Sequence, residues 1–127
     1  CYCGKNGCVE AYCSANALRE EARESLELFF AKLRSGEASE VRLWDTFLHH
    51  LARVISNIRN ILDVDFMLGG FLNAYFCQED YATLARLAQE NCGISDENIR
   101  ILSGSHDDQI TSIGAGLYYI RDFLDKI

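Results

Sequence analysis

The first ten residues of the chain hold the side chains best suited to chemistry, in the pattern C-x-C-G-x-x-G-C-x-E. The thiols of Cys1, Cys3 and Cys8 are separated by residues that include two glycines, which permit tight turns. A thiolate cluster wrapped by such turns can surround a tetrahedral Zn²⁺ ion. The spacing therefore predicts a structural zinc site with these three cysteines as ligands. Glu10 follows directly, so the metal-bound loop would fix the direction of its carboxylate.

The six cysteines of the chain also allow two other interpretations. Disulfides are typical of small secreted domains with few long helices, whereas this sequence is rich in helical patterns. An iron–sulfur cluster would need four thiolates at spacings that the chain does not show. Metal binding is therefore favoured for the first three cysteines. Cys13, Cys77 and Cys92 are expected to be small buried apolar side chains.

Glu10 and two pairs of glycines each have a functional and a structural interpretation. Glu10 could accept hydrogen bonds from a ligand, or it could simply be an acid in the first turn of a helix, where the helix dipole favours it. Gly69 and Gly70 follow a strand-like segment, where exposed backbone can approach a ligand or merely form a turn. Gly114 and Gly116 could likewise lie near a ligand or permit close helix packing.

The elements that must position these residues follow from apolar periodicity and from helix stop signals. Helix and strand order predicts an α/β fold with at least one parallel pair of strands. The longest helix has an apolar face wide enough to pack against a sheet or another helix, and a coiled-coil seam is the alternative. We expect helices over residues 9–19, 25–33, 38–62, 78–91 and 111–126, a charged stretch over 19–24, strands over 64–68 and 98–102, and a polar loop over 103–108.

Length and composition limit the classes of protein that the chain can represent. Its 127 residues are 49% hydrophobic, which fits a single domain with its own core over residues 1–127. A net charge of −7 argues against contact with nucleic acid by this part of a protein. No apolar run is long enough to span a bilayer. Because the sequence opens on a candidate metal ligand, we expect it to be a piece of a longer protein. The histidines (His49, His50, His106) are expected at surface or boundary positions, and the acidic pair Asp107–Asp108 is expected to be solvated.

The opening motif resembles the signature of the ROK family, which groups bacterial sugar-responsive repressors with sugar kinases. The similarity continues through residues 11–15 (AYCSA), 65–70 (DFMLGG) and 113–116 (IGAG). It implies the C-terminal lobe of an actin-like, ribonuclease H-like ATPase fold, rich in helices, with a zinc-binding loop at residues 1–10. It also implies a structural zinc held by Cys1, Cys3, Cys8 and a histidine from upstream, and a Glu10 carboxylate that contacts sugar hydroxyls.

The resemblance leaves two principal functions open. The first is the sugar-binding part of a transcriptional repressor similar to the xylose and N-acetylglucosamine repressors. The second is the C-terminal lobe of a sugar kinase similar to glucokinases and fructokinases, with Gly69 and Gly70 bordering ATP and Mg²⁺. Phe71 stands where the family usually has a third glycine, and residues 10–14 and 43–45 look like those of regulator members, so the repressor is favoured. A scaffold that no longer binds a ligand is a third option.

The resemblance also bears on catalysis and on partners. The family's catalytic aspartate and first phosphate-binding loop belong to the N-terminal lobe, so we predict no catalytic residue in this chain. The implied partners are a sugar or sugar-phosphate effector and a second copy in a homodimer. Contact with DNA would come only through an N-terminal helix-turn-helix region outside this sequence. The implied location is the cytoplasm.

Overall fold

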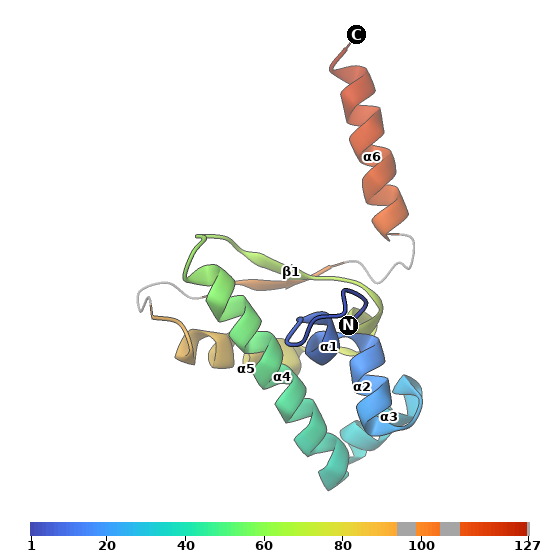
Figure 1. The fold of residues 1–127 in the computed structure, drawn as a ribbon, viewed down its shortest axis with the longest axis vertical. Coiled ribbons are helices and arrows are strands. Elements are labelled where there is room, and N and C mark those ends of the chain that lie inside the picture. Colours follow the sequence, from blue (N-terminus) through green and yellow to red (C-terminus); the bar gives the residue numbers. More distant parts are fainter. Residues whose placement is uncertain (94–98, 105–109, 127) are drawn as a thin grey trace.

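The computed structural model describes residues 1–93, 99–104 and 110–126. Six α-helices, one 3-10 helix and two strands are found in these residues, and Figure 1 shows their arrangement. His106 and the pair Asp107–Asp108 lie outside the described residues. In chain order the elements are α1 (Glu10–Cys13), α2 (Ala15–Ala22), α3 (Leu26–Ser35), α4 (Ala38–Arg59), β1 (Phe66–Leu68), η1 (Phe71–Tyr75), α5 (Gln78–Glu90), β2 (Ile101–Ser103) and α6 (Ile110–Leu124).

The expected single helix over residues 9–19 is wrong, because the chain forms two helices with a break at Ser14. Ser14 has extended backbone angles (φ −104°, ψ 161°), and its hydroxyl accepts a hydrogen bond from the amide of Ala17 at 3.1 Å. A serine hydroxyl that satisfies an amide of the first turn is a helix N-cap, so a new helix begins after it. That helix runs through part of the charged stretch and ends at Arg23, which is left-handed (φ 57°).

The next two helices agree closely with their predicted positions. Ser25 caps the start of α3 with its hydroxyl, and Gly36 ends the helix with a left-handed backbone (φ 86°). Helix α4 begins at the predicted residue and ends three residues earlier than expected, at Arg59. The wide apolar face of α4 packs against α5 and α3, so core packing is correct and the coiled-coil alternative is not needed.

The core lies where α3, α4 and α5 meet, and Trp44 stands at its centre. The rings of Phe30, Phe47 and Phe76 all have centroids within 5.1 Å of the Trp44 ring. The indole Nε1 of Trp44 donates a hydrogen bond of 2.8 Å to the Asp80 carboxylate. The core therefore combines apolar packing with a buried polar contact between α4 and α5. Its most buried apolar side chains are Leu18, Phe29, Leu48, Ala52, Ile55, Leu84 and Ala88.

The two strands form a parallel pair, as predicted, in which Phe66 lies opposite Ile101 and Leu68 opposite Ser103. Both are shorter than expected, with three residues each. A strand of this length contributes little stability alone, so the packing of α4 and α5 must hold the sheet in place. The 3-10 helix η1 follows β1 and was not predicted, because five residues are too few to show a helical repeat.

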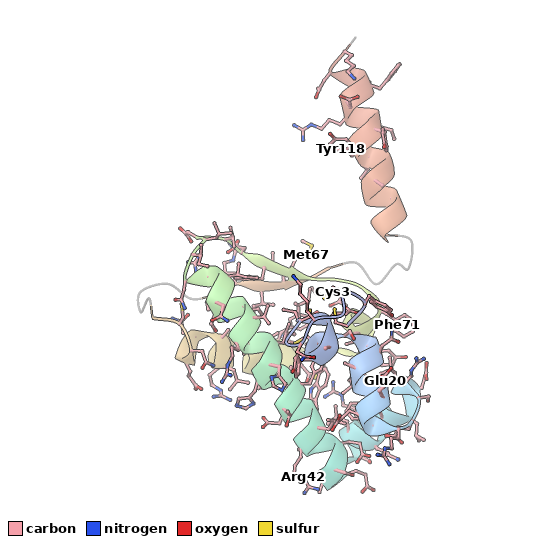
Figure 2. The ribbon with its side chains drawn as sticks, in the orientation of Figure 1. Cys3, Glu20, Arg42, Met67, Phe71 and Tyr118 are labelled. Carbon is pink, nitrogen blue, oxygen red and sulfur yellow. The ribbon has the colours of Figure 1, made fainter. Side chains whose placement is uncertain are left out.

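Helix α6 projects from the rest of the molecule, and Tyr118 stands on it far from the core (Figures 1 and 2). Every side chain from 113 to 126 is exposed. The predicted helix is therefore present, but its apolar side chains are not buried against this chain. In the described part of the chain, no helix is both long and apolar enough to cross a membrane.

Candidate metal and ligand site

The opening loop brings the three predicted zinc ligands together. The amide of Gly4 donates to the carbonyl of Cys1 at 3.0 Å, and Gly4 has a left-handed backbone (φ 71°) that closes this turn. The Sγ atoms of Cys1 and Cys3 are 3.4 Å apart, and those of Cys3 and Cys8 are 3.2 Å apart. All three sulfur atoms lie within 4.8 Å of one another. Figure 2 shows Cys3 in this loop, beside α1.

This geometry suits a thiophilic metal ion. Sulfur ligands bound to zinc at about 2.3 Å lie about 3.8 Å apart in a tetrahedral site, close to the separations found here. The hydrogen bond between Cys3 and Cys8 lowers the pKa of the Cys3 thiol and raises the pKa of the Cys8 thiol. Within the described residues, no histidine or carboxylate joins the three sulfurs.

The other cysteines do not belong to this cluster. Cys13 is half-buried against the core, and burial raises the pKa of its thiol. Cys77 caps the start of α5, where its sulfur and the Asp80 side chain form a reciprocal capping box. Cys92 Sγ donates to the side-chain oxygen of Asn60 at 3.2 Å. All three are only partly buried, so the expected apolar role describes Cys13 but misses the polar contacts of Cys77 and Cys92.

Glu10 occupies the first turn of α1, directly after the thiol cluster. Among the described residues, no hydrogen bond or ion pair engages its carboxylate, and the residue is exposed. It lines two neighbouring cavities, one of about 360 Å³ that also contains Cys1, and one of about 350 Å³ that extends toward β1. A carboxylate that faces a cavity without an internal partner can accept hydrogen bonds from a ligand.

The second cavity also contains the predicted glycine turn. Gly69 and Gly70 line it, and Gly70 has φ 79° and ψ −173°, a conformation that essentially only glycine adopts. A Cβ added at either glycine would meet no atom within 4 Å, so the backbone faces open space. Phe71, the next residue, is 56% exposed and lines the same cavity. The structure therefore places Glu10 and the glycine turn around one cavity, which lies between α1, α4 and the end of β1.

Other residues that sequence reasoning considered lie elsewhere. His49 is exposed and contacts the backbone carbonyl of Asp45 on its own helix, and the exposed ring of His50 packs near Tyr12. Both are surface residues, as expected. Gly114 and Gly116 are part of the projecting helix α6, where a Cβ would meet no atom within 4 Å, so neither permits close helix packing here.

Two polar residues of the cavity were missed by sequence reasoning. Ser14 lines it next to Glu10, and its helix-cap role was the signal that could have revealed it. Asn73 also lines the cavity, although only 1% of its surface is exposed. A buried amide in a short segment between a strand and a helix often satisfies backbone groups, but its partners cannot be inferred from spacing. Asn73 donates to the carbonyl of Gly104 at 2.9 Å and accepts a hydrogen bond from the Tyr81 hydroxyl.

Comparison with known proteins agrees with this architecture. The model of the ROK family matches residues 1–120. The fold is similar to the crystal structure of a ROK hexokinase from Thermus thermophilus, with a TM-score of 0.79 and 19% sequence identity. That match covers 95% of this chain and 43% of the hexokinase chain, so this chain spans less than half the length of that relative. No curated protein sequence matches the chain. The predicted α/β lobe of an actin-like fold is confirmed.

Proposed function

The chain belongs to the ROK family, and from that premise we propose that it is the sugar-binding part of a ROK-type transcriptional repressor similar to the xylose and N-acetylglucosamine repressors. The observation that carries this proposal is the cavity of about 350 Å³ that Glu10 shares with the Gly69–Gly70 turn. Sugar hydroxyls need acceptors that are not already paired, and the Glu10 carboxylate has no partner among the described residues. A cavity of this volume is also in the range of small-molecule sites.

The thiol cluster supports the same proposal by fixing the direction of Glu10. Cys1, Cys3 and Cys8 would hold a structural Zn²⁺ ion, and only one residue separates the last of them from Glu10. A bound metal would remove conformational freedom from the loop, so the carboxylate would be oriented before the ligand arrives. The ion would contribute stability and would take no part in chemistry, as in other sites built from several thiolates.

Phe71 favours the repressor over the kinase. Phe71 is 56% exposed and lines the cavity directly after Gly70, where its ring would narrow the space available to a nucleotide. The alternative function is an ATP-dependent sugar kinase, with Gly69 and Gly70 next to ATP and Mg²⁺. The similarity of the fold to a ROK hexokinase favours this second candidate. For the kinase, the catalytic aspartate would come from outside this chain.

As a repressor part, the chain would act in the cytoplasm through a change of conformation. A sugar or sugar phosphate would bind more tightly to one of two arrangements of the repressor and would shift a homodimer toward it. Contact with DNA would come from a helix-turn-helix outside this sequence. The net charge of −7 supports that division of roles, because an acidic surface repels phosphate.

A sugar titration with two matched variants tests the proposal. Xylose, glucose, fructose, N-acetylglucosamine and their phosphates are titrated into the zinc-loaded chain, and binding is followed by NMR. Glu10→Gln should weaken binding about tenfold or more, because a hydrogen bond to a charged group is lost. Glu79→Gln, which neutralises a first-turn carboxylate on α5, should change nothing. The same affinity in the Glu10 variant and the parent would contradict the assignment of Glu10.

A nucleotide titration distinguishes the two candidate functions. The repressor proposal expects no saturable binding of ATP with Mg²⁺ by the chain. Saturable binding that is lost when Gly70 is replaced by alanine would favour the kinase instead. If the chain binds neither sugar nor nucleotide, the sugar-binding proposal is wrong for this chain.

A further inference from the structure

The parallel ladder between β1 and β2 stops one step earlier than the backbone allows. In such a ladder, alternate residues of one strand bond to the residues before and after their partner on the other. The amide of Phe66 donates to the carbonyl of Arg100 at 2.9 Å, and the amide of Gly104 donates to the carbonyl of Leu68 at 2.7 Å. The next bond in this series would run from the amide of Gly70 to the carbonyl of Gly104.

The side chain of Asn73 takes that position in the ladder. Its Nδ2 atom donates to the carbonyl of Gly104 at 2.9 Å. Gly70 turns away from the ladder with φ 79° and ψ −173°, and within the described residues no hydrogen bond engages its amide. The carbonyl of Gly70 is instead held by the amide of Asn73 at 3.1 Å. Asn73 therefore satisfies the ladder acceptor that the Gly70 amide would otherwise use.

Asn73 is itself fixed from several sides. Its side-chain oxygen accepts a hydrogen bond from the Tyr81 hydroxyl on α5, and its Nδ2 also lies 3.4 Å from the hydroxyl of Ser103. The ends of β1 and β2 are in close contact beside Asn73, because a Cβ at Gly104 would lie only 2.6 Å from the carbonyl oxygen of Leu68. With 1% of its surface exposed, the side chain cannot exchange its partners for water.

We propose that Asn73 is a positioning residue: its amide replaces the last bond of the ladder and so leaves the Gly70 amide as a free donor for a ligand oxygen. Gly70 and Asn73 line the same cavity as Glu10, so the freed amide and the Glu10 carboxylate belong to residues around one space. A hydroxyl group, which both donates and accepts, matches that pair. The ligand part of this inference rests on the proposed function, whereas the backbone arrangement does not.

Amide hydrogen exchange measured by NMR tests the backbone arrangement without a ligand. In the parent chain the Gly70 amide should exchange without protection, whereas the Gly104 amide should be protected. Asn73→Leu removes the competing donor, so the Gly70 amide should move onto the Gly104 carbonyl and exchange about tenfold more slowly. If the leucine variant does not fold, Tyr81→Phe serves in its place. It removes the hydrogen bond to the Asn73 side-chain oxygen but keeps the Asn73 donor, so exchange at Gly70 should slow by a smaller factor.

A matched control separates positioning from general destabilisation. Asn91 donates from Nδ2 to the carbonyl of Leu87 at 2.7 Å, at the end of α5. Asn91→Leu should leave the exchange of Gly70 unchanged. The inference is overturned if the Gly70 amide is protected in the parent, or if Asn73→Leu changes exchange in α4 as much as at Gly70. For any sugar that binds the parent, Asn73→Leu should weaken binding about tenfold. A lack of binding by the parent would count against the proposed function only.

Discussion

Replacing Asp80 with alanine should destabilise the fold more than any change of a surface carboxylate. Asp80 is 5% exposed and joins three elements. Its carboxylate accepts hydrogen bonds from Arg34 of α3, from Nε1 of Trp44 in α4 at 2.8 Å, and from the amide of Cys77 before α5 at 2.8 Å. Burial alone would raise the pKa of Asp80, but these hydrogen bonds outweigh it and hold the pKa below its ordinary value.

The expected loss of stability in Asp80→Ala follows from these three hydrogen bonds. Arg34 is 42% exposed, so solvent screening limits its ion pair with Asp80 to about 1 kcal/mol. The indole of Trp44 would keep a buried donor without an acceptor, which costs about 1 kcal/mol or more. Loss of the bond to the Cys77 amide, which caps α5, costs about 1 kcal/mol. The free energy of unfolding of the variant should therefore be about 3 kcal/mol lower, and its Tm should fall by about 10 °C.

Urea unfolding followed by circular dichroism measures this loss. The control is Asp63→Ala, which removes the ion pair between Arg59 and a carboxylate that is 83% exposed. Its cost should stay below about 0.5 kcal/mol. If Asp80→Ala costs less than about 1 kcal/mol, or no more than the control, then the buried network does not join the three helices as we describe.

Three further outcomes are expected. The pKa of Asp80 in the folded chain lies below its ordinary value of 3.8, so its contribution to stability should be lost as pH falls from 3.8 through the folded-state pKa. The urea midpoint should therefore drop over this pH range in the parent and much less in Asp80→Asn. An equal dependence of the two midpoints on pH would contradict this. Cys3→Ser should abolish the binding of one zinc per chain measured by mass spectrometry, whereas Cys13→Ser should retain it; equal zinc contents would remove the assigned site. Gly104→Ala should lower the Tm because its Cβ would meet a backbone carbonyl at 2.6 Å. The control Gly116→Ala should leave the Tm unchanged or raise it. A lower Tm for Gly116→Ala than for Gly104→Ala would refute the packing at Gly104.

The helices could be predicted from the sequence because their signals are local. The apolar spacing of α3, α4 and α5 and the stop at Gly36 lie within single segments, and the observed bounds differ by a few residues. The break at Ser14 was not predicted although its signal is also local, because the surrounding residues favour a helix and a serine can lie within a helix as well as cap one. The thiol cluster is similarly local, since eight residues with two glycines can gather three sulfur atoms without help from the rest of the chain.

The sequence by itself therefore determined helices α3, α4, α5 and α6, the parallel order of the strands and the clustering of the three thiols. Tertiary structure alone decided that Glu10 and the Gly69–Gly70 turn share one cavity, because these segments are distant in sequence and meet only when both pack beside α4. It also decided the role of Asn73, whose partners on β2 and α5 are distant in sequence. Apolar periodicity indicates which face of a segment is buried. It does not indicate which distant donor forms a hydrogen bond to a buried carbonyl, because that pair meets only in the folded chain.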